Sequence, residues 1–244
     1  MTDPDGTRHR LWRIEDQTAI ETVHRTLRDT ELLIADGHHR YETARVYAEE
    51  VGGDGAHRYA LMYLVSLEDP GLEIFPTHRL LVGLDEQRRE ALHGELERDW
   101  EITDVAPDEL QPTGDGPVRA GYLEGGRARM LSLRDQAIAD AALPGHAEPY
   151  RRLDTAVLEA LVLQGALNMT EDDISHLNGL EYARSTEEAR ARVDNGEADA
   201  AFFMRSTPVE QVREVAAAGE TMPPKSTYFF PKVLTGLLFN PLTD

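Results

Sequence analysis

LLIADGHHRYETA, residues 32–44, is the stretch on which the expected fold depends. Its first four residues, 32–35, are apolar and predict a short buried strand, and the following Asp36-Gly37 predicts a turn. From His38 to Glu50 apolar residues recur every three or four positions, which predicts a helix. We therefore expect a strand that turns directly into a helix. The free backbone N–H groups and the positive dipole end of such a helix favour a phosphate or a carboxylate.

The same turn carries two imidazoles, a guanidinium and a carboxylate. We identify Asp36 and His38 as candidate catalytic residues, able to accept a proton, with Asp36 also able to position magnesium. The alternative is a purely structural role, in which Asp36 caps the helix, Gly37 makes the turn and Arg40 pairs with a glutamate. Titratable residues gathered at one turn favour the functional interpretation. The candidate phosphate- or nucleotide-binding residues of the turn are Gly37, His38, His39, Arg40 and Thr43.

Two later segments supply further candidates. Thr77, His78 and Arg79 follow a strand candidate, so they can face the same pocket as the turn, although a surface salt bridge is the common role of such a pair. Lys225 and Lys232 are the only lysines among 25 basic residues. A compact ammonium binds phosphate as a point charge, and the Ser226 hydroxyl lies next to Lys225 in the sequence. Alternatively, the two lysines pack their stems over the aromatic residues of the tail.

Three segments, ADGHHRYETA (35–44), PTHR (76–79) and MPPKSTYFFPK (222–232), occur in this order. On these segments the chain resembles the domain-of-unknown-function 1015 family of bacteria and archaea over nearly its whole length. Members of that family are usually longer at the N-terminus, so the resemblance implies that this chain corresponds to their C-terminal part. The Asp-Gly-His-x-Arg turn also resembles the phosphate-binding turn of the ParB/sulfiredoxin-like fold, which includes a free-serine kinase.

These resemblances imply three alternative functions. The first is a nucleotide-dependent kinase that uses ATP or ADP with magnesium and acts on a small hydroxylated metabolite such as serine. The second is a non-catalytic nucleotide-binding or regulatory protein. The third is a fragment completed by a separate N-terminal chain or by homo-oligomerisation. The sequence does not decide between an enzyme and a binding protein.

Several classes of site have no support in the sequence. With no cysteine, the chain cannot form disulfides, thiolate zinc sites or the thiol chemistry of sulfiredoxin. Phosphate-loop, dinucleotide-binding and HExxH motifs do not occur. No apolar run approaches about 20 residues, and the N-terminus is polar, so we expect neither a membrane span nor a signal peptide, and a cytoplasmic location.

The net charge of −20 argues against duplex DNA as a partner, because phosphate neutralisation dominates that affinity. An acidic chain with almost no lysine is typical of proteins that work in concentrated salt, where self-repulsion is screened. We therefore expect the high-salt cytosol of a salt-accumulating halophilic archaeon. A GC-rich genome also replaces lysine by arginine, but it does not explain the acidic excess.

Strands and helices alternate along the chain, which predicts an α/β or α+β fold with a mixed, partly parallel sheet and flanking helices. We expect three regions: a ParB-like region 1–106 that contains the turn, a linker with a hairpin at 107–150, and a C-terminal α/β region 151–244. The predicted strands are 9–14, 32–35, 59–65, 118–124, 127–133 and 198–204. The predicted helices are 16–28, 38–50, 85–99, 153–167, 185–193 and 207–218.

The composition leads to a test of salt dependence. Because screening weakens the repulsion among the acidic side chains, we expect the midpoint of thermal unfolding to rise markedly from low to multimolar potassium chloride. Circular dichroism across a salt series measures the midpoint. A flat response would contradict the adaptation to salt.

Overall fold

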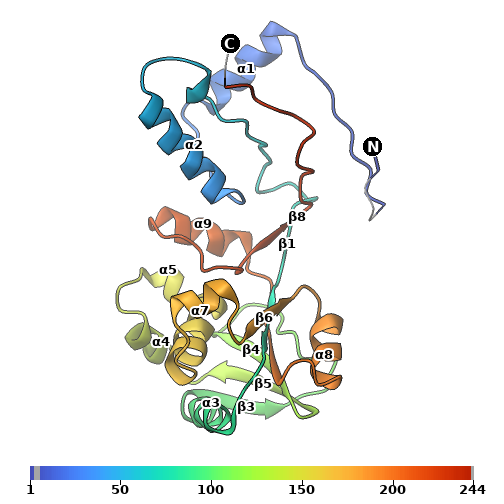
Figure 1. The fold of residues 1–244 in the computed structure, drawn as a ribbon, viewed down its shortest axis with the longest axis vertical. Helices are drawn as coiled ribbons and strands as arrows, with labels where there is room; N and C mark the ends of the chain where they lie inside the picture. Colours follow the sequence, from blue (N-terminus) through green and yellow to red (C-terminus); the bar gives the residue numbers. More distant parts are fainter. Residues whose placement is uncertain (3–5, 243–244) are drawn as a thin grey trace. The chain divides into compact units, whose positions relative to one another are not determined.

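The protein is described here by a computed structural model that covers residues 1–2 and 6–242. The chain forms two compact units, Met1–Ile34 and Ala35–Asp244. Figure 1 shows the ribbon coloured along the sequence. Within the described residues no helix is long and apolar enough to cross a membrane.

The first unit contains an isolated bridge between Thr2 and Arg8 and the helix α1 (Gln17–Leu27). The Asp16 carboxylate accepts a hydrogen bond from the backbone N–H of Thr18 at 3.0 Å, so the local cap that begins this helix is built into the sequence. Among the described residues of α1, none is buried.

The second unit is built around a six-stranded sheet with the strand order β3-β5-β4-β7-β2-β6. A separate two-stranded ladder pairs β1 (Glu73–Phe75) with β8 (Tyr228–Phe230). In the described part of the chain, every ladder of both sheets is antiparallel. The strands of the larger sheet are β2 (His78–Leu81), β3 (Trp100–Asp104), β4 (Arg119–Glu124), β5 (Arg127–Leu133), β6 (Leu180–Ala183) and β7 (Ala200–Phe203).

The class is therefore α+β, as predicted, but the expected parallel pairing is wrong. The strands β6 and β7 are joined through the helix α8 (Thr186–Asp194), a connection that usually places two parallel strands side by side. Here β2 lies between β6 and β7 and pairs antiparallel with both. The inserted strand comes from far earlier in the sequence, so alternation of strand and helix could not reveal it.

Residues on the two faces of the sheet alternate and contribute to two separate cores, as the period of a strand requires. Tyr122 and Phe202 pack with α3 (Glu86–Asp99) and with the helical segment that begins at α6 (Asp154–Leu158). On the opposite face, residues such as Phe203 pack against α8. The remaining helices are α2 (His38–Val51), η1 (Ala56–Arg58), α4 (Gln136–Ala142), α5 (Glu148–Arg151), the π-helical η2 (Glu159–Ala166), α7 (Glu171–His176) and α9 (Val209–Ala217).

The hairpin β4–β5 turns at Gly125-Gly126, as predicted, where both glycines have positive φ. This hairpin supplies two strands of the same sheet as β2 and β7. The region boundaries expected after residues 106 and 150 therefore cut through one sheet, whose strands come from all three expected regions.

Three predicted strands, 9–14, 32–35 and 59–65, are not formed within the described chain. A strand requires a neighbour, and none of these segments is paired in a ladder. Of the apolar residues that the structure describes, all the buried ones lie from Ile74 to Phe229. The described residues before Ile74 therefore contribute no buried side chain to the cores.

Two glycines offer a matched test of the packing. A Cβ on Gly121 in β4 would lie 1.7 Å from the backbone carbonyl oxygen of Leu110, whereas one on Gly94 in α3 would meet no atom within 4 Å. We expect Gly121→Ala to lower the free energy of unfolding by about 3 kcal/mol, at the upper end of the overpacking range. Gly94→Ala should raise it by roughly 0.5–1 kcal/mol, because alanine favours a helix interior.

Urea unfolding of both variants at constant salt measures the two changes. Equal stabilities of Gly121→Ala and the wild-type chain would contradict the close approach of Leu110 to β4.

Candidate functional site

The turn at residues 36–40 begins α2. Gly37 precedes the helix in the left-handed region, with φ 89° and ψ 26°, a conformation that glycine adopts without steric cost. The helix contains no acidic residue in its first turn, and no described side chain caps its N-terminus. The first helical bond runs from the Tyr41 N–H to the Gly37 carbonyl at 2.9 Å, which leaves the N–H groups of residues 38–40 without an intrahelical acceptor. The N-terminus of α2 can therefore accept an anion.

Asp36 does not cap this helix. Its carboxylate instead accepts from Arg40 Nη2 at 3.0 Å and from Lys232 Nζ at 3.2 Å. All three side chains are substantially exposed to solvent, so each pair alone stabilises the fold little. What matters for binding is the arrangement: two cations from distant parts of the sequence meet at one carboxylate beside a helix N-terminus.

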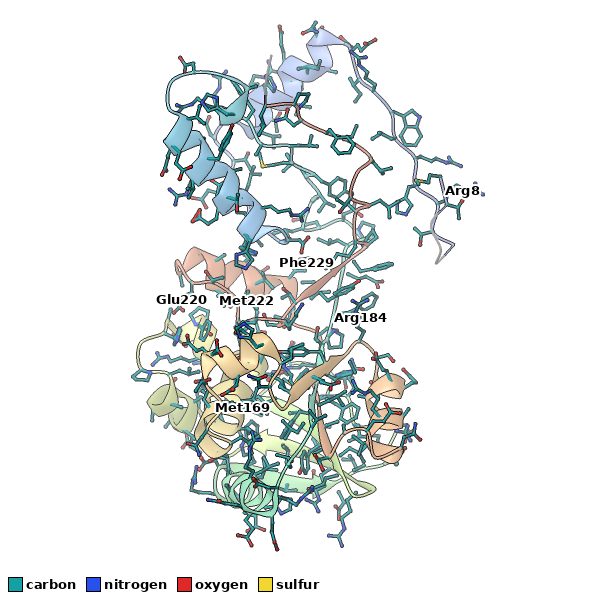
Figure 2. The ribbon with its side chains drawn as sticks, viewed as in Figure 1. Arg8, Met169, Arg184, Glu220, Met222 and Phe229 are labelled. Atoms are coloured by element: carbon teal, nitrogen blue, oxygen red, sulfur yellow. The ribbon has the colours of Figure 1, made fainter. Side chains whose placement is uncertain are left out.

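The aromatic ring of Tyr228 in β8 lies close to two cationic side chains, one of which is Lys232. Lys232 Nζ lies 5.0 Å from the centre of the Tyr228 ring, and the Arg184 guanidinium carbon lies 5.3 Å from it. Arg184 precedes α8, and Figure 2 labels it together with Phe229 of β8. Arg184 and Tyr228 were not among the sequence candidates, because no local sequence pattern marks residues that only the tertiary fold brings together.

The tail that carries Lys232 is held in place before it reaches the turn. Phe75 of β1 packs against Phe230 of β8, with ring centres 5.3 Å apart. The Thr207 hydroxyl donates to the Ser226 carbonyl at 3.1 Å, so Thr207 anchors the tail, and it makes no cap bond to α9.

Of the other predicted binding residues, Ser226 and Thr43 donate their hydroxyl groups to nearby carbonyls, and Lys225, His38 and His39 are exposed. The Ser226 hydroxyl is buried and donates to the Pro223 carbonyl at 2.7 Å, within a turn. Lys225 is exposed in that turn at φ 55°, and it forms no hydrogen bond or ion pair with another described residue. The Thr43 hydroxyl donates to the His39 carbonyl at 2.8 Å, and His38 and His39 are exposed.

Thr77, His78 and Arg79 lie in or next to β2 and are buried. Arg79, only 2 % exposed, donates from Nη1 to the Thr77 carbonyl at 2.5 Å and from Nη2 to the Pro224 carbonyl at 3.5 Å. Its guanidinium carbon also lies 5.6 Å from the centre of the Tyr182 ring. Burial lowers the pKa of Arg79 from its usual value. Arg79 therefore ties the sheet to the tail and does not line an open pocket with the turn.

His78 accepts the Met204 backbone N–H at Nδ1, 3.1 Å away, and its Nε2 lies 3.3 Å from the Thr186 hydroxyl. An accepting Nδ1 and a donating Nε2–H define the neutral imidazole. Burial, and then the positive charge of Arg79, lower the pKa of His78 to about 4. His78 is thus a structural residue of the core.

No group of three or more His, Asp or Glu side chains that could hold a metal ion occurs among the described residues. Magnesium at Asp36 would therefore need further oxygen ligands from a bound phosphate and from water. Two open cavities, of about 290 Å³ and 460 Å³, lie elsewhere in the second unit. The first is lined in part by Val118 and Arg152, and the second in part by Arg88 and Asn168.

Comparison with known proteins gives a family and several similar structures. The family model described as "Protein of unknown function (DUF1015)" matches residues 1–156. A conserved hypothetical protein from Pyrococcus furiosus is 19 % identical over 87 % of this chain and 81 % of its own, with a TM-score of 0.49. A free serine kinase in complex with AMP is 17 % identical over 87 % and 80 % of the two chains, also with a TM-score of 0.49. A mutant of free serine kinase in complex with ADP is 16 % identical over the same shares, with a TM-score of 0.48. No curated protein matches the sequence.

The neutral state of His78 gives a prediction for pH dependence. Because its pKa is about 4 in the folded chain and 6.5 without burial, the unfolded chain binds the additional proton first. The contribution of His78 to stability is complete above pH 6.5 and decreases as the pH falls towards 4. The total loss is about 3 kcal/mol, from 1.36 kcal/mol per pKa unit.

His78→Asn tests this dependence, because the amide oxygen can accept the Met204 N–H and cannot titrate. The variant will be less stable near neutrality but should lose less stability than the wild-type chain between pH 6.5 and 4. Urea unfolding at several pH values gives both slopes. Parallel slopes would contradict a buried neutral imidazole.

Proposed function

This chain belongs to the family described as "Protein of unknown function (DUF1015)", and we propose that it binds a phosphorylated small molecule, such as ATP or ADP, at the turn of residues 36–40. One observation carries the proposal. Arg40 and Lys232 converge on the Asp36 carboxylate, directly beside the uncapped N-terminus of α2. A carboxylate held by two cations occupies the kind of environment that suits a phosphate.

The composition of the chain makes the positive charge at this turn exceptional. With a net charge of −20, the average surface repels an anionic ligand. The turn brings together a guanidinium, one of the only two lysine side chains and the positive end of a 14-residue helix. These three features make it a favourable site for an anion on an acidic protein.

Each group has a distinct role in the proposed complex. The backbone N–H groups of residues 38–40 donate to phosphate oxygens, Arg40 supplies a planar fork, and Lys232 supplies a point charge. The phosphate replaces Asp36 as the partner of both cations. Asp36 is then free to bind magnesium together with phosphate oxygens.

The finer proposal is phosphoryl transfer to a small hydroxylated metabolite, with Asp36 or His38 as the proton acceptor. Serine with ATP or ADP is the first substrate pair to assay, because two of the similar structures are those of a free serine kinase. The alternative is a nucleotide-binding or regulatory protein without turnover. Formation of phosphoserine separates the two.

Substitutions at the two cations test the site. We expect Arg40→Gln and Lys232→Met each to weaken ATP or ADP binding by about 1–3 kcal/mol, the range for a hydrogen bond to a charged group. Isothermal titration calorimetry at fixed salt measures the affinities. The matched control is Arg45→Gln in the same helix, because Arg45 pairs with Glu42 and Glu49 away from the turn.

The control should bind like the wild-type chain. Wild-type affinity in both Arg40→Gln and Lys232→Met, or no nucleotide binding by the wild-type chain, would overturn the proposal.

A further inference from the structure

Residues 59–65, YALMYLV, form an uncharged apolar segment on the surface of the second unit. Six of its seven side chains are large and exposed; Met62 at the centre is 59 % exposed. Continuous apolar runs of this length are typical of strands covered on both faces. The segment therefore has the composition of a central strand and the environment of a surface loop.

The backbone of this segment is also unpaired. Within the described chain, residues 60–65 make no backbone hydrogen bond, and the segment belongs to no ladder. Unpaired N–H and C=O groups along an extended apolar stretch are a template for pairing with another strand. The exposed backbone and side chains together form a surface suited to pairing with another strand.

The exposed apolar surface continues beyond the segment, within the same unit. The Asn240 side chain donates to the Tyr59 carbonyl at 2.9 Å and so links the tail to the segment. The nearby tail contributes Leu238 and Phe239, both exposed. Helix α2 lies near the start of the segment, since the rings of Tyr47 and His57 are 6.5 Å apart, and it also carries exposed apolar side chains, namely Tyr41, Val46, Tyr47 and Val51. A surface of this extent is characteristic of protein interfaces.

The charges that flank the segment favour a particular occupant. Arg58 precedes it, and Glu68-Asp69 follows it. Antiparallel pairing with an identical segment would bring Arg58 of each copy to the acidic end of the other. Parallel pairing would place like charges together, which is unfavourable. The segment is thus self-complementary in charge when two copies run in opposite directions, which is the arrangement of a twofold dimer.

We propose that the chain forms a homodimer in which residues 59–65 pair antiparallel with the same residues of a second copy, about a twofold axis at Met62. In this register Tyr59 lies opposite Val65, and Leu61 lies opposite Tyr63. Such aromatic–aliphatic cross-strand pairs stabilise a ladder. The pairing satisfies the free backbone groups along one edge of the segment and brings the apolar surfaces of α2 and the tail of both copies together. This proposal does not rest on the proposed nucleotide binding.

The register makes Met62 its own partner across the twofold axis, which allows a charge-swap experiment. Met62→Asp would place two carboxylates opposite each other, and Met62→Lys would place two ammonium groups there. Because Met62 is exposed in the single chain, neither change disturbs its core. We expect each variant to be monomeric alone and a mixture of the two to form a heterodimer.

Size-exclusion chromatography with light scattering, in potassium chloride at the salt optimum for folding, measures the masses. The wild-type chain should give twice 27.3 kDa, about 55 kDa, and each variant alone about half of that. The equimolar mixture should return to the dimer mass. The control pair is Leu177→Asp and Leu177→Lys, because Leu177 is 48 % exposed outside this surface, and both should stay dimeric.

Three results would overturn the proposal. They are a monomeric wild-type chain, a dimer that persists in both Met62 variants, and loss of dimerisation without recovery in the mixture. A monomeric chain that forms a stoichiometric complex only with a separate polypeptide would assign the surface to that partner instead.

Discussion

The strand β2 carries a histidine and an arginine through the buried centre of the sheet, and their polar atoms must be satisfied there. An unpaired buried imidazole or guanidinium would cost several kcal/mol. His78 is satisfied by the Met204 N–H after β7 and lies within reach of the Thr186 hydroxyl of α8. Arg79 donates to the carbonyls of Thr77 and Pro224 and therefore fixes the tail against the sheet. The relative positions of β2, β7, α8 and the tail follow from these few bonds.

The candidate site depends on this constraint. Lys232 reaches Asp36 only because the tail is first held at Pro224 by Arg79, then at Ser226 by Thr207, and then in the ladder of β8 with β1. The three segments on which the family resemblance rests thus contact one another in sequence: PTHR holds the tail, and the tail reaches the turn. The middle segment contributes by positioning, which explains why a His-Arg pair can be prominent in the sequence and yet inaccessible to solvent.

The sequence allowed prediction of those elements that depend on interactions between residues close together in the chain. Helices that begin at Asp16, Asp85 and Ser185 were predictable because each cap contacts a backbone N–H two or three residues away. The hairpin at Gly125-Gly126 was predictable because the two glycines that form its turn are adjacent in the sequence. The strands expected at 32–35 and 59–65 were not formed, because apolar composition indicates that a segment seeks burial and does not show whether a partner is present.

The candidate site was accessible to sequence reasoning in the same uneven way. The scarcity of lysine drew attention to Lys232, and the turn chemistry of Asp36-Gly37 located the start of α2. The burial of His78 and the approach of Arg184 to Tyr228 depend on tertiary packing between residues far apart in the sequence, as the bond of His78 to the Met204 N–H shows. Spacing along one chain contains no record of such contacts.

The uneven distribution of buried residues has a thermodynamic consequence. Since the described buried apolar side chains all lie between Ile74 and Phe229, cooperative stability is concentrated in that span. Helices such as α2, with no buried residue among those described, should open by local fluctuations that leave the sheet intact. In the isolated chain α2 should then open before the cooperative transition of the sheet, and amide protons of α2 and of the sheet should exchange with solvent on widely different timescales. The site at the start of α2 thus belongs to the part of the molecule whose order a ligand can increase, so that binding and local folding become coupled.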